Sequence, residues 1–339
     1  MTGTLPPVEF DLSDDQLALA DAANALLDDL ASPARVRAVV DSGTGFDPDL
    51  WAAMIEQGWC GIAVAAERGG VGLGWVEAAV LAEAVGSRVA PAPIVSQLVA
   101  LDSLAGTDWF APLLDGSVIA AVAGSPDDVV PFAPLADVFV TVVDGGLVVA
   151  NITNDRPSAE PAMDLTRAIA RVAAGGKVIG DRVAAERFID AGAVAYSAEL
   201  LGVAGRMLDA TVLYAKDRVQ FDRPIGSFQA VKHRCADMLV DVEAMRSAVW
   251  WAAWCLQDRH PDASVAASTA KSWCSDAAMR VLSSALQVHG GIGFTWECDV
   301  HFFLKRAQLD SLAFGSASWH RTRLAGLLRE RVATGASVI

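Results

Sequence analysis

The segment Tyr214-Ala-Lys-Asp-Arg-Val-Gln-Phe-Asp-Arg-Pro-Ile-Gly-Ser-Phe-Gln229 decides the fold, because it connects two long stretches of helical sequence. Apolar residues recur at helical spacing from Tyr196 to Tyr214 before the segment, and again from Ala236 to Val249 after it. Two long helices joined by a short connection are expected to lie side by side in opposite directions.

The remainder of the C-terminal region also reads as helical. A third run extends from Ala263 to His289 and ends at Gly290-Gly291, which suit a helix C-terminal cap. A fourth helix is expected over residues 299–313, and a fifth could begin at Gly315-Ser316. Residues 188–339 are therefore predicted to form a helical bundle.

The stretch over residues 118–187 differs in composition from its surroundings and predicts a small β domain. Its β-branched runs are Val118–Val122, Val138–Val143 and Leu147–Val149, separated by Gly, Pro and Asp. Asp144-Gly145-Gly146 lies between two of these runs and predicts a hairpin turn.

Residues 1–117 are predicted to form an N-terminal helical domain. Ser13 can cap a first helix, and helical spacing returns over residues 50–56 and 76–85. The glycine-rich stretch at 69–74 reads GGVGLG rather than GxGxxG, and no predicted strand precedes it. It is therefore interpreted as a flexible turn and not as a dinucleotide-binding loop.

Composition excludes several classes of function. The chain has 339 residues, of which 53% are apolar, and its 41 acidic and 26 basic residues give a formal charge of −15. Such an acidic chain would repel a phosphate backbone, so we expect no nucleic-acid binding. The apolar stretch Ala248–Leu256 is far shorter than the roughly 20 residues that cross a bilayer, so we expect no membrane span.

Cysteine and histidine usage indicates a reducing compartment and no metal site. The five cysteines are widely spaced and form no CxxC pair, which favours buried thiols in the cytoplasm. No Lys or Arg precedes Arg35, so a secretory signal is not expected. The five histidines have no metal-ligand spacing, and no GxSxG, HExxH or GxxxxGK[ST] motif occurs.

The segment 214–229, together with Ala236-Asp237-Met238 and Gln287-Val-His-Gly-Gly291, closely resembles the acyl-CoA dehydrogenase family. These flavoenzymes oxidise the α,β bond of acyl-CoA thioesters. The family pattern is Arg-x-Gln-Phe, Pro-Ile, Phe-Gln, Ala-Asp-Met and then Gln-x-x-Gly-Gly, and all five occur here in that order. The resemblance covers essentially the whole chain and implies a mainly α fold with an N-terminal helical domain, a shortened middle β domain and a C-terminal four-helix bundle.

The resemblance also implies contacts to the adenosine-diphosphate end of FAD. The matching residues are Arg218, Gln220, Phe221, Ile225, Phe228, Gln229, Gln287, Val288, Gly290 and Gly291. Arg218 offers a fork of donors to a pyrophosphate, Phe221 and Phe228 offer flat apolar surface to adenine, and glycines allow close approach of the backbone. In the family, the FAD that these residues contact has its flavin ring in the neighbouring subunit.

The chain departs from the family at both positions where members carry the catalytic base. Most members place a glutamate in a Tyr-Glu-Gly-Thr-like segment, where this chain reads Leu312-Ala-Phe-Gly-Ser316, with Phe314 in the glutamate's place. Other members place the base 22 positions before the tyrosine matching Tyr214, and that position is Gly192. Neither position holds a carboxylate, so we expect no catalytic residue in this chain.

A second departure concerns the middle domain. The family holds the flavin ring with a Thr-Glu-Pro-Gly-Ala-Gly-Ser-like loop and a later Trp-x-Thr, whereas this chain reads Ala123-Gly-Ser-Pro-Asp-Asp128 and lacks the second motif. The domain is also shorter by several tens of residues. The half of the FAD site that serves the chain's own flavin is therefore predicted to be lost, and the half that serves a partner's flavin to be retained.

This combination predicts the non-catalytic subunit of an α2β2 acyl-CoA dehydrogenase, as in bacterial breakdown of sterol side chains. A second, complete acyl-CoA dehydrogenase chain would supply the glutamate, share the FAD and bind most of the acyl-CoA, and an electron acceptor such as an electron-transfer flavoprotein would reoxidise the complex. Two alternatives stay open at this point. One is a self-sufficient homotetramer with a displaced base, for which Glu199 is the nearest candidate. The other is a catalytically inactive binding or regulatory protein.

Overall fold

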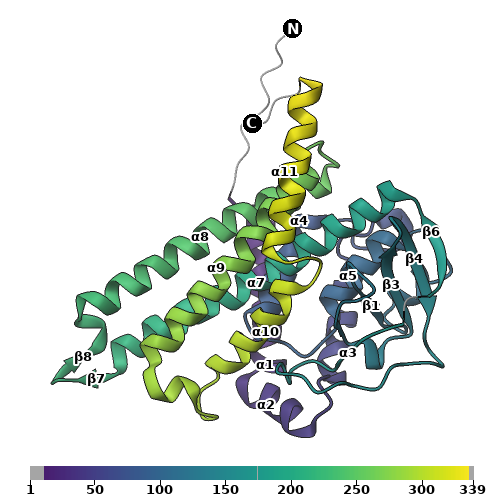
Figure 1. Cartoon of the computed structure of the whole chain (residues 1–339). Helices are drawn as coiled ribbons and strands as arrows, with labels where there is room; N and C mark the ends of the chain where they lie inside the picture. The colour runs from purple at the N-terminus through teal and green to yellow at the C-terminus, as the bar shows by residue number, and fades with distance from the viewer. Residues whose placement is uncertain (1–10, 174, 336–339) are drawn as a thin grey trace.

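The computed structural model describes residues 11–173 and 175–335, and it is mainly helical, as the sequence predicts. Figure 1 shows long helices over one side of the molecule and a small sheet on the other. The helices before the sheet are α1 (Asp14–Leu30), α2 (Pro33–Ser42), α3 (Pro48–Glu56), α4 (Trp75–Gly86), α5 (Ile94–Ser103) and α6 (Phe110–Leu114). The strands of the middle region are β1 (Ala120–Val122), β2 (Val130–Pro131), β3 (Val138–Val143), β4 (Gly146–Asn151), β5 (Ile169–Ala170) and β6 (Lys177–Gly180). The later elements are α7 (Arg182–Asp217), β7 (Val219–Gln220), β8 (Arg223–Pro224), α8 (Gln229–Gln257), α9 (Ala263–His289), α10 (Val300–Leu312) and α11 (Ala317–Thr334).

The N-terminal region contains the predicted helices and three others, α2, α5 and α6, that the sequence pattern did not reveal. Ser13 caps α1 as expected, because its hydroxyl accepts from the Gln16 backbone N–H while the Gln16 side chain accepts from the Ser13 N–H. Helix α5 was missed because Ile94 through Leu101 are all buried, so no polar face marks a helical period. Helix α2 buries only Val36 and Val39, too few for a clear pattern.

The middle region forms a four-stranded sheet in the order β1-β3-β4-β6, in which only β1 and β3 run parallel. The predicted hairpin between β3 and β4 is confirmed. Asp144 and Gly145 form its turn with φ of 50° and 78°, the left-handed values that a two-residue type I′ turn requires.

The start of α7 corrects the predicted end of the β domain. The Asp181 carboxylate accepts from the backbone N–H groups of Val183 and Ala184 at 3.0 and 3.1 Å and so caps a helix that begins at Arg182. Residues 182–187, assigned to the β domain from composition, therefore belong to α7. Their apolar content resembled that of the preceding strands. Asp181, a residue type that favours helix N-caps, was the sequence signal for a helix that begins at Arg182.

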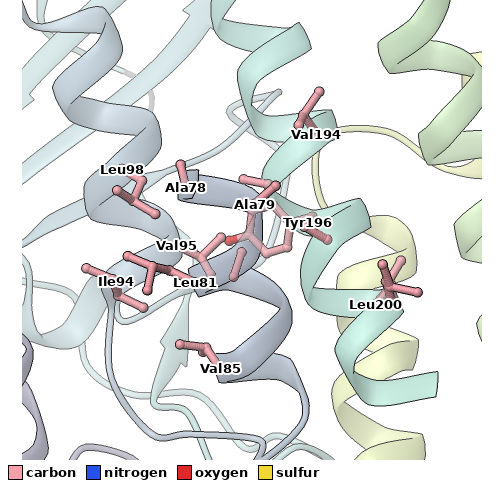
Figure 2. Packing of buried hydrophobic residues seen from close by; sticks show 14 of the residues in the cluster. Ala78, Ala79, Leu81, Val85, Ile94, Val95, Leu98, Val194, Tyr196 and Leu200 are labelled. Atoms are coloured by element: carbon pink, nitrogen blue, oxygen red, sulfur yellow. The ribbon is translucent and has the colours of Figure 1, made fainter. Parts of the chain in front are cut away.

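Helix α7 is the central element of the molecule and contacts α4, α5, α8, α9 and α10. Figure 2 shows the ring of Tyr196 on α7 reaching toward side chains of α4 and α5, among them Ala79 and Val95. Helices α4 and α7 approach so closely that a Cβ on Gly202 would lie 1.9 Å from the Glu83 carbonyl oxygen. Among the described residues, α7 alone has the length and apolar composition of a membrane span, but 89% of its apolar 18-residue stretch is buried inside the protein.

The C-terminal region forms the predicted bundle. Helices α7, α8 and α9 pack against one another, α10 packs on α7 and α9, and α11 packs on α9. The predicted run from Ala263 to His289 is confirmed as α9, and Gly290 ends it with φ of 64°. Ser316 caps α11 through its hydroxyl, which accepts from the Trp319 N–H.

Candidate functional site

The connection between α7 and α8 is a small hairpin at one end of the bundle, visible as β7 and β8 in Figure 1. Phe221 and Asp222 form its tip with φ of 54° and 63°, so this is a second two-residue turn with both residues left-handed. At its base, the Ile225 N–H donates to the Arg218 carbonyl oxygen at 2.8 Å. The hairpin therefore holds Arg218 at the end of α7 through main-chain bonds alone.

The hairpin presents aromatic and cationic groups to solvent. The side chain of Arg218 is exposed and forms no ion pair within the described part of the chain. Phe221 is 86% exposed, and its ring lies edge-to-face with Phe228 at 6.0 Å between centroids. The Arg223 guanidinium lies 4.2 Å from the centre of the Phe228 ring. The exposed ring of Phe221 and the free guanidinium of Arg218, both on this hairpin, suit a ligand that carries a flat base and phosphates.

The C-terminal end of α9 contributes the second part of this surface. Gly290 has φ of 64°, a conformation that L side chains rarely adopt, and a Cβ on Gly290 or Gly291 would have no heavy atom within 4 Å. Gln287, one turn earlier, is exposed. Open space above an uncovered backbone allows a phosphate or a ribose to approach the main chain.

A stacked pair joins the two parts. The rings of Tyr214 and His289 lie 4.4 Å apart with 18° between their planes, and the Tyr214 hydroxyl donates to the His289 carbonyl oxygen at 3.5 Å. Tyr214 lies one turn before Arg218, and His289 directly precedes Gly290. The sequence placed both residues in helical runs and motifs but did not reveal this link, which joins two residues 75 positions apart.

All ten residues predicted to contact FAD lie around this end of the bundle, from the end of α7 through the start of α8 to the end of α9. Three of them offer little to a ligand through their side chains. The Gln220 amide donates to the Val219 carbonyl oxygen at 2.8 Å, Ile225 is half-buried, and Val288 is buried. Gln229, the first residue of α8, is exposed, and its side-chain amide nitrogen lies 3.5 Å from the His233 Nε2.

The two positions expected for a base meet in space. The ring of Phe314 lies directly over Gly192, so that a Cβ on Gly192 would come within 2.1 Å of it. Phe314 is 2% exposed and also packs against Phe188 and Tyr196, with centroid distances of 5.1 and 5.6 Å. An aromatic cluster therefore fills this space. Position 192 must be glycine because any side chain there would collide with the Phe314 ring.

Two buried polar side chains hold the loop that carries Phe314. The His320 ring donates from Nε2 to the Phe314 carbonyl oxygen at 2.9 Å, and burial lowers the pKa of this histidine to about 3. The Lys271 ammonium donates to the carbonyl oxygens of Ser311 and Gly315 at 3.0 and 3.2 Å, and burial lowers its pKa to about 8. Phe314 itself has φ of 56°, a strained value that this surrounding network maintains.

The loop after β1 closes the other side of Phe314. A Cβ on Gly124 would lie 3.0 Å from the Phe314 Cα, so these two backbones are almost in contact. This loop, Ala123–Asp128, lies at the sequence position where the family's flavin-binding loop is expected. Close contact between the loop and Phe314 leaves no room for a ring system between them.

Glu199, the candidate for a displaced base, belongs to a buried ion network. Its carboxylate lies 2.8 Å from Arg306 and 3.4 Å from Arg167, and its side chain is 1% exposed. Arg306 also pairs with Asp164 at 2.9 Å, and Arg167 with Asp310 at 2.6 Å. Burial, opposed by Arg167, raises the pKa of Asp310 to about 7. The network links three regions of the chain, the loop of Asp164 and Arg167, α7 and α10, and no local pattern in the sequence identified it.

Two family profiles match the chain on either side of the sheet. The acyl-CoA dehydrogenase N-terminal domain matches residues 13–107, and the acyl-CoA dehydrogenase C-terminal domain matches residues 179–328. Acyl-CoA dehydrogenase IpdE2 of Mycolicibacterium smegmatis is 36% identical over 301 residues, which is 87% of this chain and 93% of that protein.

Solved structures of two complexes share the fold over nearly the full chain. A chain of the ChsE4–ChsE5 complex from Mycobacterium tuberculosis superposes with a TM-score of 0.84 at 27% identity, covering 95% of this chain and 99% of that one. A chain of the Tcur3481–Tcur3483 steroid ACAD gives a TM-score of 0.84 at 29% identity, covering 94% and 99%.

Proposed function

The chain belongs to the acyl-CoA dehydrogenase family, and we propose that it is the non-catalytic subunit of a heteromeric, FAD-dependent member. In this proposal the complex introduces an α,β double bond into an acyl-CoA thioester, and this chain completes the FAD site of a catalytic partner. The observation that carries the proposal is the enclosed ring of Phe314 at the family's glutamate position, packed against Gly192 at the alternative one.

The chain offers no base at the place where the family removes a proton. A general base must reach the proton that it abstracts, directly or through one water. The ring of Phe314 accepts no proton, Gly192 has no side chain, and the Glu199 carboxylate is engaged by two arginines. Glu199 is therefore a poor base, which argues against the alternative of a self-sufficient homotetramer.

The hairpin surface fits the adenosine-diphosphate end of FAD. Arg218 has a free planar fork for the pyrophosphate, Phe221 has an open ring face for adenine, and the main chain at Gly290 can be approached closely. When bound, the flavin supplies the acceptor for the hydride that leaves the β-carbon of the substrate. Arg218 lies 26 residues beyond Gly192 on α7, or roughly 40 Å at 1.5 Å per residue, which exceeds the length of one FAD. This half-site therefore serves a flavin whose ring belongs to another chain.

The partner that fits is a complete acyl-CoA dehydrogenase chain. It would supply the glutamate, the loop that holds the flavin ring and most of the acyl-CoA site, in an α2β2 assembly in the cytoplasm that passes electrons to an acceptor such as an electron-transfer flavoprotein. Exposed apolar residues around the hairpin and along α8, among them Val219 and Val240, provide surface for that contact. The likeness to chains of the ChsE4–ChsE5 complex and the Tcur3481–Tcur3483 steroid ACAD supports a heteromer and a steroid-derived thioester as substrate.

Co-expression tests this proposal. The chain would be produced alone and together with a longer family member encoded by an adjacent gene that retains the glutamate and the flavin-binding loop. We expect the chain alone to be colourless or aggregated, and the pair to co-purify as a yellow complex with one FAD for each pair of chains. A stable yellow homo-oligomer with one FAD per chain would contradict the divided site.

A further inference from the structure

A cavity of about 480 Å³ lies between α1, α2, the last turns of α7 and the start of α10. We propose that it binds an uncharged, lipid-like alcohol. Its walls include Val36, Met207, Phe302 and Phe303, each less than one-tenth exposed. The cavity is thus formed by side chains that the fold already holds in place, and its volume falls within the range of small-molecule sites. It lies at the opposite end of α7 from Phe314.

The charges of the lining argue against an anionic ligand. Four acidic and two basic residues line the cavity, and Asp28 is paired with Arg88 at 2.7 Å, while Asp299 is paired with Arg37. The charges left over are the exposed Asp217, Glu297 and Arg206, which together carry a net negative charge. A fatty acid or a CoA thioester would meet this like charge, and any ion in the apolar interior would lose its hydration without a partner.

One acceptor nitrogen in the wall suits a hydroxyl group. The His289 Nδ1 donates to the Ala285 carbonyl oxygen at 2.8 Å, which places a proton on Nδ1 and leaves the lone pair of Nε2 as the acceptor. This nitrogen has no hydrogen-bond partner among the described residues, although His289 is 8% exposed and lines the cavity. An alcohol would donate its O–H to Nε2 while its hydrocarbon part covers the phenylalanine rings of α10.

This inference does not rest on the proposed function. The cavity shares the Tyr214–His289 pair with the hairpin surface, but Arg218, Phe221 and Gly290 do not line it. If no alcohol binds in the cavity, the proposal of an FAD half-site at the hairpin is unaffected. If the hairpin binds no FAD, the proposal of an alcohol site is likewise unaffected.

Binding is measured on the full chain, with its partner present if solubility requires it, by titrating the uncharged dye Nile red. Competition then uses 1-dodecanol, dodecanoate and dodecyltrimethylammonium, which share one hydrocarbon chain and differ in charge. We expect the alcohol to displace the dye at a concentration about tenfold or more below that of either ion. Ala210→Phe fills the cavity from α7 and should abolish the signal, whereas Ala22→Phe on the exposed face of α1 is the matched control and should preserve it.

A second variant keeps the test decisive if Ala210→Phe fails to fold. His289→Phe retains a ring opposite Tyr214 and the backbone carbonyl that Tyr214 contacts, but it removes the acceptor nitrogen. Its affinity for dodecanol should fall about fivefold, the effect of one hydrogen bond, while Nile red binds as before. The proposal is overturned if the folded wild type binds no dye, if Ala210→Phe binds it equally, if either ion competes better than the alcohol, or if His289→Phe leaves the alcohol affinity unchanged.

Discussion

Replacing Arg218 by alanine in the complex with the catalytic partner is expected to weaken FAD binding while leaving the fold intact. The structure separates the two effects, because the backbone of Arg218 makes the bonds that hold the hairpin. Its N–H donates to the Tyr214 carbonyl oxygen and its own carbonyl accepts from Ile225, both at 2.8 Å, and alanine keeps both bonds. The side chain is exposed and forms no ion pair within residues 11–173 and 175–335, so the melting temperature should hardly change.

The magnitude follows from the contact that the guanidinium would make. A hydrogen bond to a charged group contributes about 1.5–3 kcal/mol, which corresponds to a roughly ten- to hundredfold loss of FAD affinity. Arg218→Lys should recover only part of this, because an ammonium keeps the charge but cannot present a planar fork to a pyrophosphate. Arg329→Ala is a matched control, because Arg329 of α11 is also exposed and makes no ion pair in the described structure.

The assay is flavin content after dialysis, read from the visible absorbance, followed by turnover with and without added FAD. Arg218→Ala should lose flavin and activity together, and excess FAD should restore the activity because the partner's glutamate and pocket are unchanged. Full flavin retention in the alanine variant would refute the reasoning. This chain would then not close the cofactor site, and only its family membership would stand.

Other variants test the packing around the two ends of α7. Phe314→Ala should destabilise the fold by about 3–5 kcal/mol, as measured by denaturant unfolding, because it leaves a cavity among Phe188, Tyr196 and Gly192. Phe314→Glu should produce no turnover, and appreciable activity would show that a flavin faces this pocket. Tyr214→Leu removes the stack on His289 and should lower FAD affinity in equilibrium binding, whereas Tyr214→Phe should retain it. His320 has a folded pKa lowered to about 3 by burial, below its usual value near 6.5, so its contribution is present above pH 6.5 and is lost as the pH falls toward 3. The slope of unfolding free energy between about pH 6 and 4, at most about 1.4 kcal/mol per pH unit from this group, should flatten in His320→Gln.

Features that depend on neighbouring residues in the chain were predictable from the sequence alone. The bounds of α9, the Ser13 cap of α1 and the turn at Asp144-Gly145 follow from local periodicity, capping and turn preferences. The ordered motif from Arg218 to Gln229 identified the family because it lies on one continuous segment. Where burial was uniform, as in α5, the pattern carried no helical signal and the helix was missed.

The sequence by itself therefore determined the family, most long helices and the motif residues that gather at the hairpin end of the bundle. Only the tertiary structure decided what surrounds them. Phe314 and Gly192 are 122 positions apart, and their contact exists because α7 and the loop after α10 meet in the core. The same holds for Glu199, whose two arginines come from the loop at Arg167 and from α10, and for the stack of Tyr214 on His289. The physical reason is that a side chain's packing and charge partners are set by distance in space, which residue spacing along the chain does not encode.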